Sequence, residues 1–262
     1  MRLKMYQVDA FASTLFSGNP AAVVILESVI SDNLMQSIAS ENNLSETAFV
    51  NINESPISIR WFTPTLEINL CGHATLASAK VLFEHFPNLV GNEIAFNSKS
   101  GTLKVIKQKE TICLNFPADD PLLQEMDIIF SEALGELPSQ LLKGKDDYLA
   151  VFSTEEQIRS IRPNFKKLST INSRGVVISA PGNDVDFVSR CFYPQTGVNE
   201  DPVTGSAHTM LIPYWASQLN KNELLAQQVS ERGGLLGCKL GEDRVYISGR
   251  SIIYFDGFIT IV

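Results

Sequence analysis

The sequence predicts two α+β domains, each with several strands around one central helix. Three observations support this fold class. Apolar segments of strand length recur along the chain, each half holds one glycine-headed helical segment that is apolar on all sides, and the motifs of the first half return in the second. A helix that is apolar all round is a buried one, so other elements must surround it. The 262 residues suffice for two domains of ordinary size.

The internal repeat is visible in paired motifs. The residues R-W-F-T-P at 60–64 match R-C-F-Y-P at 190–194, and turns with Gly72 (C-G-H-A-T) and Gly205 (T-G-S-A-H) follow them. The second copy has three extra residues before its glycine, since 72−60 is 12 and 205−190 is 15, and the copies then stay 133 residues apart (205−72). A period of this length indicates a duplicated domain and not a solenoid. We expect domains over 1–118 and 119–262, with the last strand able to pack on the first domain.

The first copy defines the order of the elements. Short runs rich in β-branched and aromatic residues predict strands at Tyr6–Phe11, Ala21–Leu26, Thr47–Asn51, Ser58–Phe62, Glu93–Phe96, Thr102–Lys107 and Thr111–Phe116. The chain's closing residues, I-I-Y-F-D-G-F-I-T-I-V, predict strands around an Asp-Gly turn, which would tie the C-terminus into a sheet.

Three helices follow from spacing and capping residues. The segment Asp32–Glu41 predicts an amphipathic helix, and Ser31 is placed to cap its N-terminus. The two segments that are apolar on all sides predict the buried central helices, Gly72–His85 and Gly205–Gln218.

Composition excludes several classes of partner. The formal charge is −8, the pI is near 5.0, and the Lys and Arg residues are scattered, whereas nucleic-acid binding needs them clustered. No segment approaches the roughly 18–20 apolar residues of a membrane-spanning helix, and the N-terminus lacks the apolar stretch of a secretory signal. The four cysteines form no C-x-x-C pair. We therefore expect a cytoplasmic protein with reduced thiols that binds neither nucleic acid nor membrane.

The starts of the two central helices are candidate binding sites. A helix N-terminus has free N–H groups and a partial positive charge, and small residues let an anion approach them closely. If the two domains face each other, both helix starts could meet at one cleft. Two of the three histidines, His73 and His208, lie in these turns. Small residues here also fit tight packing alone, and His208 also fits a hydrogen-bonded core position. The pattern favours a small anionic substrate.

Three motifs together identify a family resemblance. S-E-T-A-F-V at 45–50, L-C-G-H-A-T-L-A at 70–77 and E-D-P-V-T-G-S-A-H at 200–208 resemble the PhzF-like isomerases of phenazine biosynthesis. The N-terminal V-D-A-F…S-G-N-P-A-A-V also fits, so the resemblance runs nearly end to end. It implies the diaminopimelate-epimerase-like fold, with two pseudo-symmetric domains, each a largely antiparallel sheet or barrel around a central helix and the active site between them. It also implies a homodimer.

The resemblance further implies isomerisation without a cofactor or a metal. The glutamate of S-E-T-A-F, here Glu46, would take a proton from one carbon and return it to another, and His73 and Asp201 would act in the same cleft. Fixed donors would stabilise the delocalised anion that forms. Substrate binding, including that of its carboxylate, is implied for a second group of residues: Asn19, Gly72, Gly205 and Ser206.

Two other functions remain open at this level. Related racemases and epimerases use two cysteines, one at the start of each central helix. Cys71 lies beside one helix start, but the second copy offers Asp201 and Thr204 and no thiol. The scaffold could also serve a non-catalytic anion-binding protein. A metal site from Cys71, His73, Asp201 and His208 lacks any recognised ligand spacing.

Overall fold

The chain forms two compact units with mixed sheet and helix. The computed structural model describes residues 1–261. Unit 1 contains Met1–Asn115 together with the segment from Ser248 onward, and unit 2 contains Phe116–Ile247. The predicted α+β class is confirmed, although the described strands form an open sheet and not closed barrels. No helix within residues 1–261 has the length and apolarity needed to cross a membrane.

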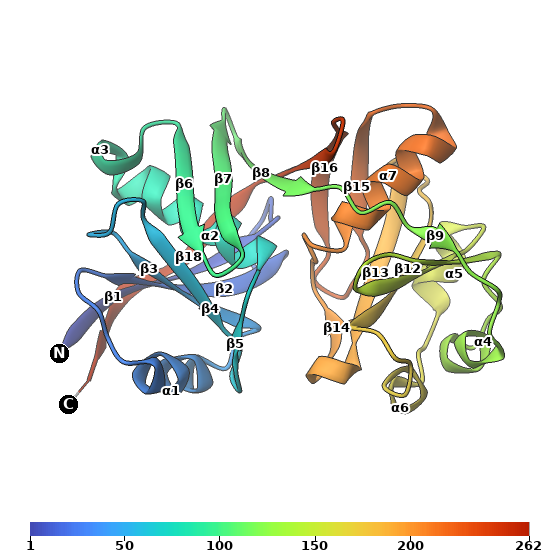
Figure 1. The fold of residues 1–262 in the computed structure, drawn as a ribbon, viewed down its shortest axis with the longest axis horizontal. Coiled ribbons are helices and arrows are strands. Elements are labelled where there is room, and N and C mark those ends of the chain that lie inside the picture. Colours follow the sequence, from blue (N-terminus) through green and yellow to red (C-terminus); the bar gives the residue numbers. More distant parts are fainter. Residues whose placement is uncertain (262) are drawn as a thin grey trace. The chain divides into compact units, whose positions relative to one another are not determined.

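Unit 1 is built from β-strands on either side of a buried helix (Figure 1). The elements in chain order are β1 (Arg2–Ala10), β2 (Asn19–Leu26), α1 (Asp32–Asn42), β3 (Glu46–Asn51), β4 (Ser58–Phe62), β5 (Glu67–Ile68), α2 (Gly72–His85), α3 (Pro87–Val90), β6 (Glu93–Ser98), β7 (Gly101–Gln108), β8 (Thr111–Pro117) and the C-terminal β18 (Ser251–Thr260). Most neighbouring strands are antiparallel, but β2 and β3 pair in parallel.

Unit 2 has the same plan with a larger set of outer helices. Its elements are β9 (Leu122–Leu123), α4 (Ile128–Leu134), β10 (Gln140–Lys143), β11 (Asp147–Val151), α5 (Glu155–Ser160), α6 (Phe165–Leu168), β12 (Gly175–Pro181), β13 (Phe187–Tyr193), the 3₁₀ turn η1 (Pro194–Thr196), β14 (Val198–Asp201), α7 (His208–Leu219), β15 (Glu223–Gln228), β16 (Gly234–Leu240) and β17 (Arg244–Gly249). Here β11 and β12 pair in parallel, as do β13 and β15.

Two of the predicted helices are confirmed. Ser31 caps α1, since its hydroxyl accepts a hydrogen bond from the Leu34 N–H at 3.3 Å. Apolar residues of α1 pack on β2 and β3 around Phe49. The central helix α2 spans Gly72–His85 as predicted, and nearly all of its residues are buried. It contacts β1, β2 and β3, so the sheet of unit 1 is covered by helices on both faces.

The second central helix begins later than predicted. Helix α7 starts at His208, and the residues from Gly205 to Ala207 form a tight turn before it. The His208 ring explains the delay, because its Nδ1 lies 2.8 Å from the Thr204 carbonyl and takes the place of a backbone helix bond. The His208 N–H instead bonds to the Gly205 carbonyl at 3.1 Å, which tightens the chain.

The predicted Asp-Gly turn near the C-terminus is wrong. Residues 256 and 257 lie inside the single strand β18, which pairs along β1 (Figure 1). Asp256 lies opposite Tyr6, and Gly257 lies opposite Met5. Ten residues of extended pairing outweigh the local turn preference of Asp-Gly. The expectation that the C-terminus is tied into a sheet is confirmed.

Candidate functional site

In unit 1, three predicted site residues come together from separate elements. Glu46 is the first residue of β3, His73 the second of α2, and Asn19 the first of β2. The parallel pairing of β2 and β3 brings the two strand starts to one end of the sheet. Gly72 opens α2 and is buried, so the backbone there has no side chain in front of it. The strand ends and the helix start therefore build one polar cluster.

The imidazole of His73 is the centre of this cluster. Its Nε2 lies 3.1 Å from Glu46 Oε2, as an ion-pair contact without the alignment of a hydrogen bond. On the other side of the ring, Nδ1 lies 3.2 Å from the amide nitrogen of Asn19 and 3.5 Å from Cys71 Sγ. The side chains of Glu46 and His73 are 15% and 5% exposed. A carboxylate and an imidazole are thus held against each other with little water around them.

The charge state of His73 depends on its neighbours. Burial alone lowers the pKa of His73, but the charges of Cys71 and Glu46 raise it, and the net pKa lies well above its ordinary value. The neutral ring accepts from the Asn19 amide at Nδ1, whereas the protonated ring needs an acceptor there. Asn19 can supply either group by turning its amide. The pair is therefore suited to holding a proton.

Cys71 belongs to the same cluster but is not an activated thiol. It is buried at the N-cap of α2, and burial together with the charge of Glu46 raises the pKa of its thiol. A thiol acts as a base or nucleophile only as the thiolate. This environment therefore favours a packing or hydrogen-bonding role for Cys71.

The cluster contains three residue types that bind metals, namely Glu46, Cys71 and His73, whose ligand atoms lie within 4.8 Å of one another. However, Cys71 approaches Nδ1 of the imidazole and Glu46 approaches Nε2. A metal ion bound at Nδ1 would therefore lie beside Cys71 but not Glu46, and one bound at Nε2 would lie beside Glu46 but not Cys71. The geometry therefore favours acid–base use over a tetrahedral metal site.

In unit 2, the predicted residues lie between β14 and α7. Asp201 ends β14, and its carboxylate accepts a hydrogen bond from the Thr204 hydroxyl. Gln228 supports this loop, since its amide oxygen accepts from the Thr204 N–H at 2.8 Å. Gly205 and Ser206 form the turn that leads into α7. These residues belong to a different unit from Glu46 and His73, and the expectation that they share a cleft with them stays a prediction.

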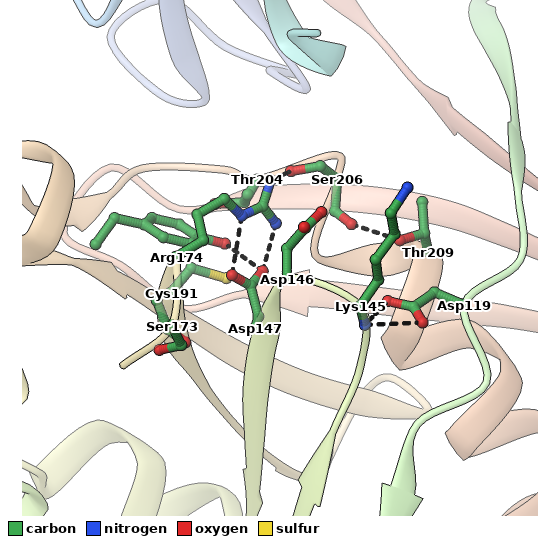
Figure 2. Close-up of polar contacts among 12 residues, drawn as sticks. Asp119, Lys145, Asp146, Asp147, Ser173, Arg174, Cys191, Thr204, Ser206 and Thr209 are labelled. Carbon is green, nitrogen blue, oxygen red and sulfur yellow. Dashed lines mark hydrogen bonds and ion pairs between the residues drawn. The ribbon is translucent and has the colours of Figure 1, made fainter. Parts of the chain in front are cut away.

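An ion pair beside the turn at Gly205 and Ser206 was not predicted from the sequence. Arg174, just before β12, forms a two-point contact with Asp147, the first residue of β11, and also reaches Ser206 (Figure 2). The only sequence signal is the run of charges in K-G-K-D-D at 143–147, which is typical of a solvated loop. Asp147 is in fact buried.

His208 has a structural role. Its Nδ1 is held by the Thr204 carbonyl, and burial lowers the pKa of His208 to about 4. The ring is therefore neutral at physiological pH. Together with its contact to the buried Phe187, this identifies His208 as a core histidine that shapes the start of α7.

A family model described as phenazine biosynthesis-like protein, PhzC-PhzF, matches residues 8–257. The chain belongs to this family. A relative from Pseudomonas aeruginosa, named as an uncharacterised isomerase, is 49% identical over 261 residues that cover 100% of both chains. A crystal structure of a PhzF family protein from Enterococcus faecalis is 44% identical, covers 100% of both chains and has a TM-score of 0.96. The PhzF family is thus the family of this chain, and its reaction class is isomerisation.

The fold extends to more distant proteins. A hydroxyproline epimerase from Agrobacterium vitis is 10% identical, with a TM-score of 0.64 over 98% of this chain and 92% of its own. At this identity the likeness concerns the fold alone. It supports the predicted epimerase-like architecture.

Proposed function

We propose that this PhzF family member moves a proton between two carbons of a small carboxylate substrate, with Glu46 as the single acid and base. The observation that carries the proposal is the contact of 3.1 Å between Glu46 Oε2 and His73 Nε2 in a nearly dry environment. A carboxylate with one oxygen against a proton-holding imidazole can both accept a proton and return it.

The proposed reaction balances without a cofactor. Glu46 removes a proton from an allylic carbon, and the electron pair left behind delocalises over the neighbouring double bond. Glu46 then delivers a proton to the far carbon of that system, so that a double bond moves and nothing is oxidised or reduced. Its side chain is 15% exposed, so the proton it holds can exchange with solvent between the two transfers. The imidazole of His73 stabilises the charge on Glu46 before and after each transfer.

Binding of the substrate carboxylate is proposed for the small-residue turns. The backbone N–H groups at Gly72 and His73 lie in the first turn of α2, where N–H groups have no partner within the helix. Gly205 and Ser206 precede α7 in the same manner in unit 2. Such turns are suited to a carboxylate because the helix dipole and the N–H groups act together.

A thiol-based racemase is the second candidate, and Cys71 is the observation in its favour. Its buried, protonated thiol and the presence of Thr204 at the matching position of the second copy speak against it. Cys71→Ala should keep most activity if Glu46 is the base. Complete loss in that variant would support the racemase.

The experiment is deuterium exchange from D₂O into sodium salts of small unsaturated acids that carry allylic protons, namely crotonate, glutaconate and sorbate, followed by NMR. The wild-type chain should incorporate deuterium, and Glu46→Gln should lower the rate about a thousandfold. Glu93→Gln is a matched control, because Glu93 also begins a strand but is exposed. Exchange that survives in Glu46→Gln would contradict the assignment. Intact binding without exchange in the wild type would indicate a non-catalytic binding protein.

A further inference from the structure

In unit 2, the guanidinium of Arg174 joins a buried carboxylate to the serine at the start of α7. Its Nε donates to Asp147 Oδ1 at 2.9 Å, and its Nη2 contacts Asp147 Oδ2. Its remaining nitrogen, Nη1, donates to Ser206 Oγ at 3.2 Å (Figure 2). One arginine thus uses both edges of its planar group.

The position of Arg174 is fixed from several sides. The side chain of Asp147 is 4% exposed, so the paired carboxylate cannot exchange its partner for water. The ring of Tyr193 lies 5.4 Å from the guanidinium carbon, and its hydroxyl lies 3.4 Å from Asp147 Oδ2. A two-point contact to a buried carboxylate is rigid. Arg174 therefore presents Nη1 to Ser206 in one orientation.

This contact sets the direction of the Ser206 hydroxyl. A guanidinium has only donors, so Ser206 Oγ must accept from Arg174. Within residues 1–261, Ser206 Oγ has no other hydrogen bond, because Thr209 bonds to the Ser206 carbonyl and not to its hydroxyl. The hydroxyl hydrogen consequently points away from Arg174 and is available to donate.

We propose that Arg174 is a positioning residue that commits Ser206 to donating a hydrogen bond to an anionic oxygen of the substrate; this inference rests on the proposed function above. A hydroxyl that accepts from a cation becomes a better donor, since hydrogen bonds in a chain polarise one another. The positive charge of the Arg174 guanidinium, which contacts Ser206 Oγ, favours binding of a carboxylate over an uncharged amide of the same shape. Arg174 thereby selects the charge of the substrate without touching it.

Binding measurements separate this role from a structural one. Isothermal titration would compare crotonate, glutaconate and sorbate with their uncharged amides. Arg174→Gln should weaken carboxylate binding about tenfold, because the Ser206 hydroxyl loses the cation that orients and polarises it, and leave amide binding unchanged. In the double variant with Ser206→Ala, affinity should equal that of Ser206→Ala alone, because Arg174 acts through Ser206.

Two further variants distinguish a specific effect of Arg174 from a general loss of the fold. Arg174→Gln leaves Asp147 buried without its partner, so Asp147→Asn is combined with it to remove the buried charge. Arg190→Lys is the matched control, because Arg190 makes the same two-point contact with Glu200 and does not contact Ser206. Arg190→Lys should retain carboxylate affinity.

Each outcome bears on one of the two proposals. Equal carboxylate affinity in the wild type and in Arg174→Gln, or additive losses in the double variant, would overturn the role of Arg174 alone. A tenfold loss combined with no deuterium exchange by the wild type would overturn the proton-shift proposal and leave Arg174 as an anion-selecting residue. A wild-type chain that binds none of the three carboxylates would overturn both.

Discussion

Each unit has a parallel strand pair, β2–β3 in unit 1 and β11–β12 in unit 2, but the acidic residue lies on a different strand of the pair in each. In unit 1, β2 and β3 place Ala21 opposite Glu46. In unit 2, β11 and β12 place Asp147 opposite Gly175. The acidic group has therefore moved from one strand of the pair to the other, and in unit 2 the residue before the glycine is Arg174.

The antiparallel neighbours confirm that these positions correspond. Thr47, one residue after Glu46, pairs with Phe62, and Val176, one residue after Gly175, pairs with Phe192. The two phenylalanines occupy the same place in the repeated motifs R-W-F-T-P and R-C-F-Y-P. The duplication thus kept the framework and changed the residues at one end of it.

Gly175 shows why unit 2 has no counterpart of the Glu46 side chain. A Cβ at position 175 would lie 2.1 Å from Cδ1 of Tyr193 and 2.5 Å from the Phe192 carbonyl oxygen. The ring of Tyr193 fills the space where unit 1 has a carboxylate, and its hydroxyl approaches Asp147. At this position, unit 2 has a packed tyrosine ring beside the Arg174–Asp147 ion pair, whereas unit 1 has the Glu46 carboxylate against His73.

The starts of the two central helices, α2 and α7, also share their backbone support but differ in one functional side chain. At the offset of 133 residues, His73 corresponds to Ser206, and Thr75 corresponds to His208. Thr75 and His208 each bond by their side chain to the carbonyl four residues earlier. The backbone support is thus conserved between the copies, while the residue facing the substrate in the proposal changes from an imidazole to a hydroxyl. Under the proposed function, unit 1 would supply proton transfer through Glu46, and unit 2 would supply anion recognition through Ser206.

The largest expected effect on stability comes from breaking the repeated ion pairs. Arg190 pairs with Glu200, and Arg60 pairs with Glu67, at matching positions. Arg190 is 10% exposed, so Arg190→Gln should lower the free energy of unfolding by about 3–5 kcal/mol. Arg60→Gln should cost about 1 kcal/mol, because Lys99 still pairs with Glu67. Urea denaturation checks the order, and equal losses would contradict it.

The next effect is a pH dependence of stability from His208, whose unit 1 counterpart, Thr75, has no titratable side chain. Burial lowers the pKa of His208 to about 4, whereas an unfolded histidine titrates near 6.5. Between these values the unfolded chain binds a proton that the folded chain excludes, so stability falls as pH drops, by about 3 kcal/mol from this group. Replacing His208 with threonine, its unit 1 counterpart, should flatten the profile between pH 6.5 and 4. An unchanged slope in that variant would assign the effect to other groups.

A smaller effect should follow from adding a side chain where unit 2 lacks one. Gly175→Ala forces its methyl group against Tyr193 and should lower the free energy of unfolding by about 2 kcal/mol. Tyr193→Ala in the same chain should recover part of that loss, a coupling that a double-mutant cycle measures. Full additivity would show that the tyrosine ring does not occupy this space.

Some of these features could be predicted from the sequence because they depend on local patterns. Helix α2 and the Ser31 cap follow from a glycine turn, an apolar run and a short polar side chain. The start of α7 could not be predicted, since a side chain competes there for a backbone carbonyl. The same holds for β18, where pairing with β1 overrides the Asp-Gly preference.

The candidate site could be predicted only in part from the sequence, because its residues are brought together by contacts between distant parts of the chain. Glu46 looks like an ordinary polar strand residue, and only the family motif marked it for proton transfer. The role of Arg174 depends on partners 27 and 32 residues away, Asp147 and Ser206, which the fold brings together. Long-range contacts of this kind leave no spacing in the sequence.

The most direct test of this division is a comparison of kcat and KM for Glu46→Gln and Ser206→Ala with the substrate found by deuterium exchange. Glu46→Gln should lower kcat about a thousandfold with little change in KM. Ser206→Ala should raise KM about tenfold and keep most of kcat. Loss of kcat in Ser206→Ala with near-normal turnover in Glu46→Gln would contradict this division.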